Sequence, residues 1–179
     1  MRTLIVFESM FGNTARVARA VAEGFARSAG EPTLMDVGDA AEVPVAGYDV
    51  LVLGGPTHAF SMSRRSTRDD AVRQGASSGH AARGIREWLD AQAADPAGSV
   101  RPPAAVFDTR VAKVRRLPGS AARRAAKSLR GQGYDLLDRP TSFYVTDVDG
   151  PLLDGEEDRA RAWGDALVVL AREALGRRA

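Results

Sequence analysis

The feature that most constrains this chain is its alternation of short apolar segments with longer amphipathic ones. Thr3–Phe7 is continuously apolar after its first residue, and Asp49–Gly54 is a second run of this kind. Strands that lack a polar face are typical of parallel sheets, which are buried on both sides. Between them, Thr14–Ala29 carries apolar residues at four-residue spacing, which predicts a helix that buries one face. This order predicts an α/β protein.

The rest of the chain continues the pattern. Further strands are expected at Thr33–Val37, Ala104–Phe107 and Ser142–Asp147, the last with the polar alternation of an edge strand, and further helices at Gly79–Ala93, Ser120–Arg130 and Glu156–Leu175. We expect residues 55–78 to be largely irregular and 95–103 to form a loop. With no internal repeat and no second core, residues 1–179 are predicted to form one domain, a parallel sheet between two helical layers.

Composition excludes several classes of protein. The chain has no cysteine, so disulfides, thiolate metal sites and a cysteine nucleophile are excluded. Its two histidines, His58 and His80, lie far apart without a carboxylate at helical spacing, and no metal site is predicted. No apolar run approaches the roughly 18 residues of a membrane span, and no signal segment is recognisable. We therefore expect a soluble, cytoplasmic protein without a membrane partner.

The charges are unevenly distributed along the chain. Residues 110–130 contain eight Lys or Arg and no acid, whereas residues 147–158 contain six Asp or Glu and no base. Aromatic residues do not interleave with the bases, so we expect no nucleic-acid partner. If the basic segment lies beside a functional site, it favours an acidic protein partner or an anionic substrate. The alternative is a solvated helix face.

Three segments that follow strands are the places where an α/β sheet binds ligands. In the first, Ser9-Met10-Phe11-Gly12-Asn13-Thr14, hydroxyls, an amide and a glycine precede a helix N-terminus. Such a terminus offers unpaired N–H groups that suit a phosphate. The segment has no lysine and is therefore not a Walker loop. The alternative is an ordinary helix cap.

The first segment resembles the FMN-phosphate loop of the flavodoxin family, Ser/Thr-x-Thr-Gly-Asn-Thr, and Gly54–Phe60 is similar to that family's second flavin loop. The resemblance implies a flavodoxin-like, doubly wound sheet of five parallel strands in the order 2-1-3-4-5, with FMN as the cofactor. It also implies a set of cofactor-binding residues. These are Ser9, Met10, Phe11, Gly12, Asn13, Thr14, Pro56, Thr57, His58, Ala59, Phe60, Asp108, Thr109 and Arg110.

The chain departs from the family pattern in three places. Phe11 replaces a threonine, which removes one hydroxyl from the phosphate loop. The third segment, Asp108–Val111, differs from the Gly- and Asp-rich version of the family. The family often has a glycine in the second loop whose peptide reorients, and Ala59 stands at the matching place. A side chain disfavours positive φ by about 1–2 kcal/mol, so we expect this reorientation to be hindered.

Three functions are compatible with the sequence. The first is an FMN-binding electron carrier that works with a redox partner protein and has no catalytic residue of its own. The second is an FMN-dependent NAD(P)H or quinone oxidoreductase of the same fold, which the long basic segment Arg64–Gly79 and the sequence Pro56-Thr57-x-x-Phe60 favour. The third is a non-flavin interaction module that has kept the fold, which Phe11 and the altered third segment favour.

Overall fold

The computed structural model describes residues 1–93 and 101–178. The strands are β1 (Thr3–Phe7), β2 (Thr33–Asp36), β3 (Val50–His58), β4 (Ser61–Met62), β5 (Ala104–Val111) and β6 (Thr141–Val145). The α-helices are α1 (Asn13–Ala29), α2 (Arg65–Arg73), α3 (Ile85–Gln92), α4 (Ala121–Gly131) and α5 (Glu156–Gly176). None of the helices within the described ranges combines the length and apolar character needed to cross a bilayer.

Five parallel strands form the sheet in the order β2-β1-β3-β5-β6. Numbered along the parallel strands alone, this is the predicted order 2-1-3-4-5, and the predicted fold is confirmed. β6 is an edge strand, as its alternating sequence indicates. The sixth strand, β4, pairs antiparallel with the end of β3 through Thr57–Met62 and His58–Ser61.

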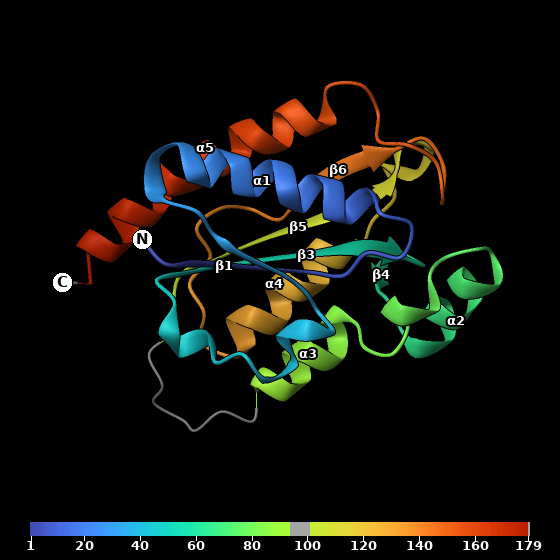
Figure 1. The fold of residues 1–179 in the computed structure, drawn as a ribbon, viewed down its shortest axis with the longest axis horizontal. Helices are drawn as coiled ribbons and strands as arrows, with labels where there is room; N and C mark the ends of the chain where they lie inside the picture. The colour runs from blue at the N-terminus through green and yellow to red at the C-terminus, as the bar shows by residue number, and fades with distance from the viewer. Residues whose placement is uncertain (94–100, 179) are drawn as a thin grey trace.

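Alternate residues of each inner strand enter two separate cores. In β1, Leu4 joins the core beneath α3 and α4, whereas Ile5 joins the core beneath α1 and α5. β3 divides in the same way, with Leu51 on the first side and Val52 on the second. Figure 1 shows the resulting layers, with α1 and α5 over one face of the sheet and α3 and α4 over the other. Because both faces are covered, the ends of the strands are left for ligands.

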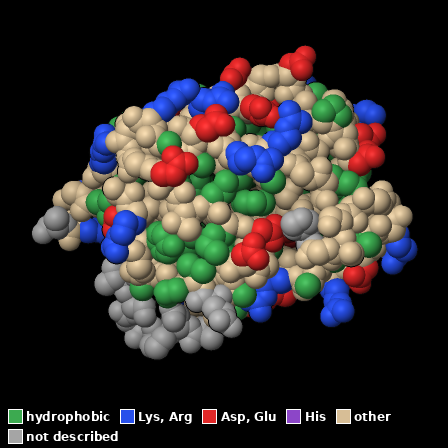
Figure 2. All heavy atoms as spheres, viewed as in Figure 1, with side chains coloured by type: hydrophobic (Ala, Val, Ile, Leu, Met, Phe, Trp, Pro, Cys, Tyr) green, Lys and Arg blue, Asp and Glu red, His purple; other side chains and the backbone are tan. Residues whose placement is uncertain are grey.

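α1 and α5 pack closely because two glycines face each other. A Cβ on Gly24 would lie 2.9 Å from the Cα of Gly164, and a Cβ on Gly164 would collide with the carbonyl oxygen of Val21. Ion pairs also join the two helices on the outside. These are Arg16–Glu157, Arg27–Asp165 and Arg161–Glu23. Figure 2 shows basic and acidic side chains mixed over this upper part of the molecule.

Several predicted boundaries were wrong. β3 and β5 continue to His58 and Val111, so part of the second predicted loop and all of the third belong to strands. The segment expected to be largely irregular contains β4 and α2. α2 escapes prediction because it has no apolar stripe, and its buried residues are Arg68 and Ala71. The third predicted helix begins at Ile85 rather than at residue 79. Most of the predicted loop 95–103 lies outside the described residues.

We predict that Gly24→Ala lowers the free energy of unfolding by about 1–3 kcal/mol, since the added methyl group must push α1 and α5 apart. The matched control is Gly176→Ala at the end of α5, where a Cβ meets nothing within 4 Å. That change should leave the free energy of unfolding unchanged or raise it by up to about 1 kcal/mol. Urea unfolding followed by circular dichroism measures both, and equal effects of the two substitutions would contradict the close packing.

Candidate functional site

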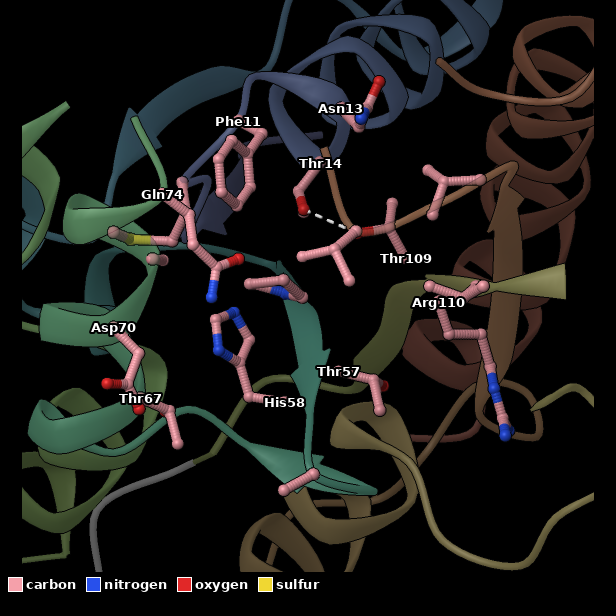
Figure 3. Close-up of a pocket in the computed structure, with 17 residues that line it drawn as sticks. Phe11, Asn13, Thr14, Thr57, His58, Thr67, Asp70, Gln74, Thr109 and Arg110 are labelled. Carbon is pink, nitrogen blue, oxygen red and sulfur yellow. Dashed lines mark hydrogen bonds between the residues drawn. The ribbon is translucent and has the colours of Figure 1, made fainter. Parts of the chain in front are cut away.

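A pocket of about 250 Å³ opens at the carboxyl ends of the central strands (Figure 3). It is bounded by the N-terminus of α1, the ends of β3 and β5, helix α2 and the turn after β6. Its lining residues are Met10, Phe11, Asn13, Thr14, Pro56, Thr57, His58, Ala59, Thr67, Asp70, Ala71, Gln74, Thr109, Arg110, Val111, Val145 and Val148. The three segments that the sequence singled out therefore meet at one site.

The start of α1 can receive an anion. Gly12, the N-cap residue, has a φ of 87°, which favours glycine, and it has no side chain with which to cap the helix. The first turn carries no acidic residue. The N–H groups at a helix start have no partner within the helix, and the helix dipole adds positive potential there. A Cβ on Gly12 would meet nothing within 4 Å, so the approach to these N–H groups is open.

The hydroxyl groups around the pocket are arranged as donors. Ser9 Oγ accepts a hydrogen bond from the N–H of Ala15 at 3.2 Å, and Thr57 Oγ1 accepts one from the N–H of Ala121 at 2.9 Å. The hydroxyl oxygens of Thr14 and Thr109 lie 2.8 Å apart, and one donates to the other. A hydroxyl that accepts from the protein keeps its own proton to donate. The site therefore favours a ligand rich in acceptor oxygens.

The side chain of Asn13 has a structural role. Its amide Nδ2 donates to the carbonyl oxygen of Gly150 at 2.6 Å, which ties the turn after β6 to the start of α1. Val148 in this turn lines the pocket. Asn13 thus shapes the pocket wall.

Two consecutive residues in the tight turn between β3 and β4 adopt left-handed backbone conformations. Ala59 has φ 45° and Phe60 has φ 60°. A two-residue hairpin turn of type I′ requires positive φ at both positions, where glycine and asparagine are the usual residues. The sequence predicted that Ala59 would resist positive φ, yet the turn holds it there. The backbone beside the pocket is therefore strained.

The side chains at the end of β5 point to different places. The carboxylate of Asp108 is fully buried and accepts from the N–H of Ala122 at 2.8 Å, at the start of α4. Thr109 faces the pocket. The guanidinium of Arg110 donates to the carbonyl oxygens of Val114 and Leu117, at 2.7 and 3.2 Å. Asp108 and Arg110 thus hold the segments that surround the pocket.

Helix α2 forms a wall that the sequence analysis missed. Its pocket-facing residues are Thr67, Asp70, Ala71 and Gln74. Their spacing of three, one and three residues places them on one helix face. Figure 3 shows the side chains of Gln74 and His58 directed toward the same part of the pocket. A search for polar as well as apolar periodicity in residues 65–74 would have identified this face.

A buried polar network anchors α2. Arg68 is 1% exposed, and its guanidinium donates to Ser63 Oγ at 2.9 Å and to a carboxylate oxygen of Glu87 at 3.1 Å. Glu8 lies beside them and accepts from the N–H of Ile85 at 2.9 Å. Burial raises the pKa of Glu8, and hydrogen bonds from Ser63 and Ile85 oppose this effect. The network connects the end of β1, helix α2 and the start of α3.

His58 is held in its neutral form more strongly than a free histidine. Burial of the ring lowers its pKa, and the positive charge of Arg68 acts in the same direction. A neutral imidazole offers one donor and one acceptor. A hydrogen bond to the backbone of Thr67 opposes the lowering of the pKa and occupies the ring donor, so the other ring nitrogen is left to accept from a ligand.

Most of the predicted cofactor-binding residues line the pocket, and four do not. Ser9 lies beneath the loop, Gly12 shapes its backbone, Phe60 is exposed at the hairpin tip, and the carboxylate of Asp108 points to α4. Val111, Val145 and Val148 were not predicted and add apolar surface.

Solved structures resemble this chain in fold. A flavodoxin from the domain Archaea superimposes with a TM-score of 0.66 at 16% identity, covering 96% of this chain and 99% of that one. Flavodoxin 2 from Bacillus cereus superimposes with a TM-score of 0.65 at 19% identity, covering 94% of this chain and 98% of that one. Rubredoxin oxygen:oxidoreductase from Desulfovibrio gigas gives 0.60 at 14% identity, and this chain spans only 37% of its length. Neither a protein-family model nor a curated protein sequence matches the chain. The chain has the flavodoxin-like fold.

We predict that Ala59→Gly raises the free energy of unfolding by about 0.5–1 kcal/mol. Removal of the Cβ relieves about 1–2 kcal/mol of left-handed strain, and the freer unfolded chain offsets part of this gain. The matched control is Ala91→Gly at an exposed position of α3, which should lower stability by up to about 1 kcal/mol. Thermal and urea unfolding show whether each substitution raises or lowers the free energy of unfolding. A loss of stability in Ala59→Gly would show that the turn is not strained.

Proposed function

We propose that this protein binds FMN in the pocket and acts in electron transfer. The observation that carries the proposal is the meeting of a helix N-terminus, whose N-cap residue is a glycine, with two strand ends around one pocket of about 250 Å³. The flavodoxins that share the fold support a flavin as the ligand. When bound, FMN would supply the redox chemistry, and the protein would supply binding and orientation.

The residues present fit the phosphate of FMN. The N–H groups at the start of α1 would hold the phosphate, and Ser9, whose Oγ accepts from the N–H of Ala15, would hold the loop in place beneath it. Of the two hydroxyl protons of Thr14 and Thr109, one is used in the bond between them and the other is free to donate to the phosphate. This donor partly compensates for the hydroxyl that is missing because Phe11 stands where the family has a threonine. No acidic side chain stands in the first turn of α1 to repel the phosphate.

The residues present also fit a flat ring with polar edges. Phe11 and Val148 offer apolar surface to the pocket, and Pro56 and Val111 lie along the strand ends. The hydroxyl of Thr57 can donate to a carbonyl oxygen of the ring. The combination of apolar walls and a few donors is typical of cofactor sites.

Comparison of FMN with riboflavin tests the proposal, because riboflavin has the ring but not the phosphate. We predict that FMN titration gives flavin absorbance and quenched fluorescence, and that riboflavin binds at least about 100-fold more weakly. The phosphate contributes charge-assisted hydrogen bonds worth about 1.5–3 kcal/mol each. Thr14→Val should weaken FMN binding by about tenfold, whereas Thr33→Val on exposed β2 should not change it.

Two results would contradict the proposal. Equal affinities for FMN and riboflavin would show that the start of α1 does not hold the phosphate. Absence of FMN uptake at micromolar concentrations, with the protein folded, would leave the non-flavin interaction module as the better interpretation.

A second candidate is an FMN-dependent oxidoreductase that acts on NAD(P)H or a quinone. The polar face of α2 favours it, since Thr67, Asp70 and Gln74 stand with His58 on one wall of the pocket. Hydroxyl, carboxylate, amide and imidazole groups could orient a polar substrate against a bound ring. A pure electron carrier has no use for such a wall.

Steady-state oxidation of NADH and NADPH by the FMN-loaded protein, with a quinone as acceptor and no added reductase, separates the two candidates. The oxidoreductase predicts sustained turnover that falls at least tenfold in Gln74→Ala, with FMN affinity unchanged. Gln92→Ala at the end of α3 is the control. Turnover that stays at the level of free FMN would exclude the second candidate and leave the carrier.

A further inference from the structure

We propose that an acidic protein, as electron donor or acceptor, docks on a basic surface beside the pocket mouth. This docking surface consists of Phe60, Lys113, Arg115, Arg116, Leu117 and Arg123. The proposal rests on the proposed function, because it names the partner with which the bound flavin would exchange electrons.

The docking surface borders the pocket directly. Arg110 and Val111 line the pocket, and the chain then turns outward into the loop that carries the basic side chains. The Arg110 guanidinium is buried and bonds to the carbonyl oxygens of Val114 and Leu117, which fixes the loop from beneath. On the other side, the backbone of Gly119 packs against Phe60, since a Cβ on Gly119 would lie 2.7 Å from the Phe60 carbonyl oxygen.

The charges on this surface lack partners. Among the described residues, no carboxylate forms an ion pair with Lys113, Arg115, Arg116 or Arg123, and all four side chains are exposed. Several bases on α1 and α5 differ, because Arg16, Arg27 and Arg161 are paired with acids there. Within the described residues, no ion pair therefore offsets the charges of the docking surface. A positive surface speeds the approach of an acidic partner.

Apolar side chains lie among these charges. Phe60 is 45% exposed and Leu117 is 47% exposed. Only four large apolar side chains are this exposed within the described ranges, and a third, Val148, lines the pocket itself. Apolar residues surrounded by arginine are typical of protein interfaces, where aromatic residues and arginine are enriched. A single-stranded nucleic acid binds largely by stacking its bases on aromatic side chains, and the surface has only Phe60.

The turn after β6, the strand that pairs with β5, also borders the pocket and limits how the partner can lie. The turn after β6 carries Asp147 and Asp149 on either side of Val148. These carboxylates would repel an acidic partner. The partner would therefore lie over the loop and the start of α4, with its redox centre next to the pocket mouth. One electron would leave the reduced centre and be gained by the oxidised one, and no bond would form.

The test measures binding of the purified chain, without FMN, to a small, strongly acidic [2Fe–2S] ferredoxin by calorimetry. We expect binding at low ionic strength that weakens at least about tenfold in 200 mM salt, because screening reduces attraction between exposed charges. The double variant Arg115→Glu/Arg116→Glu should abolish this binding. Leu117→Ser should weaken it and leave the salt dependence unchanged.

The matched control is Arg19→Glu/Arg177→Glu, which changes the net charge equally at two exposed positions on α1 and after α5. It should bind the ferredoxin within about threefold of the unaltered chain. Equal losses in the two double variants would show that net charge alone acts and would overturn the docking surface. Tighter binding of a 20-mer DNA duplex than of the ferredoxin would also overturn it. Since FMN is absent, failure of flavin binding would not mimic either result.

Discussion

The pairing of Gly54 with Phe107 fixes the geometry on which the rest of this molecule depends. Phe7, Gly54 and Phe107 stand in one row across β1, β3 and β5. The ring of Phe107 occupies the place that a Cβ on Gly54 would take, so only glycine fits there. This register aligns the three strands along their length. The segments that follow Phe7 and Gly54, and the final residues of β5, then reach the same edge of the sheet, where the pocket forms.

Below that row the sheet is buried by apolar side chains, and above it polar side chains make hydrogen bonds to particular neighbouring segments. Asp108 receives an N–H from α4, Thr109 pairs with Thr14, and Arg110 bonds to two carbonyl oxygens of the following loop. These contacts join the pocket walls to one another. A polar residue within a buried strand is costly unless its hydrogen bonds are made, and here each bond also positions a neighbouring segment.

This contrast explains what the sequence could and could not predict. Apolar runs identified β1 and the first part of β3, and apolar periodicity identified α1 and α5, so the fold and the position of the pocket followed. The sequence predicted a loop at the end of β5 because Asp108 and Arg110 are polar. A strand is possible because their side chains bond to the start of α4 and to the loop that follows β5. α2 was missed because a buried Arg68, not an apolar stripe, holds it to Glu87 and Ser63. Side-chain hydrogen bonds of this kind leave no periodic pattern in a sequence.

The central claim is that the strand ends and the start of α1 together form a flavin site. A crystal structure of the chain with FMN tests it most directly. The account predicts the phosphate at the N–H groups of residues 10–14 and the ring between residues 57–59 and 109–111. A structure with the phosphate elsewhere, or with FMN outside this pocket, would contradict it.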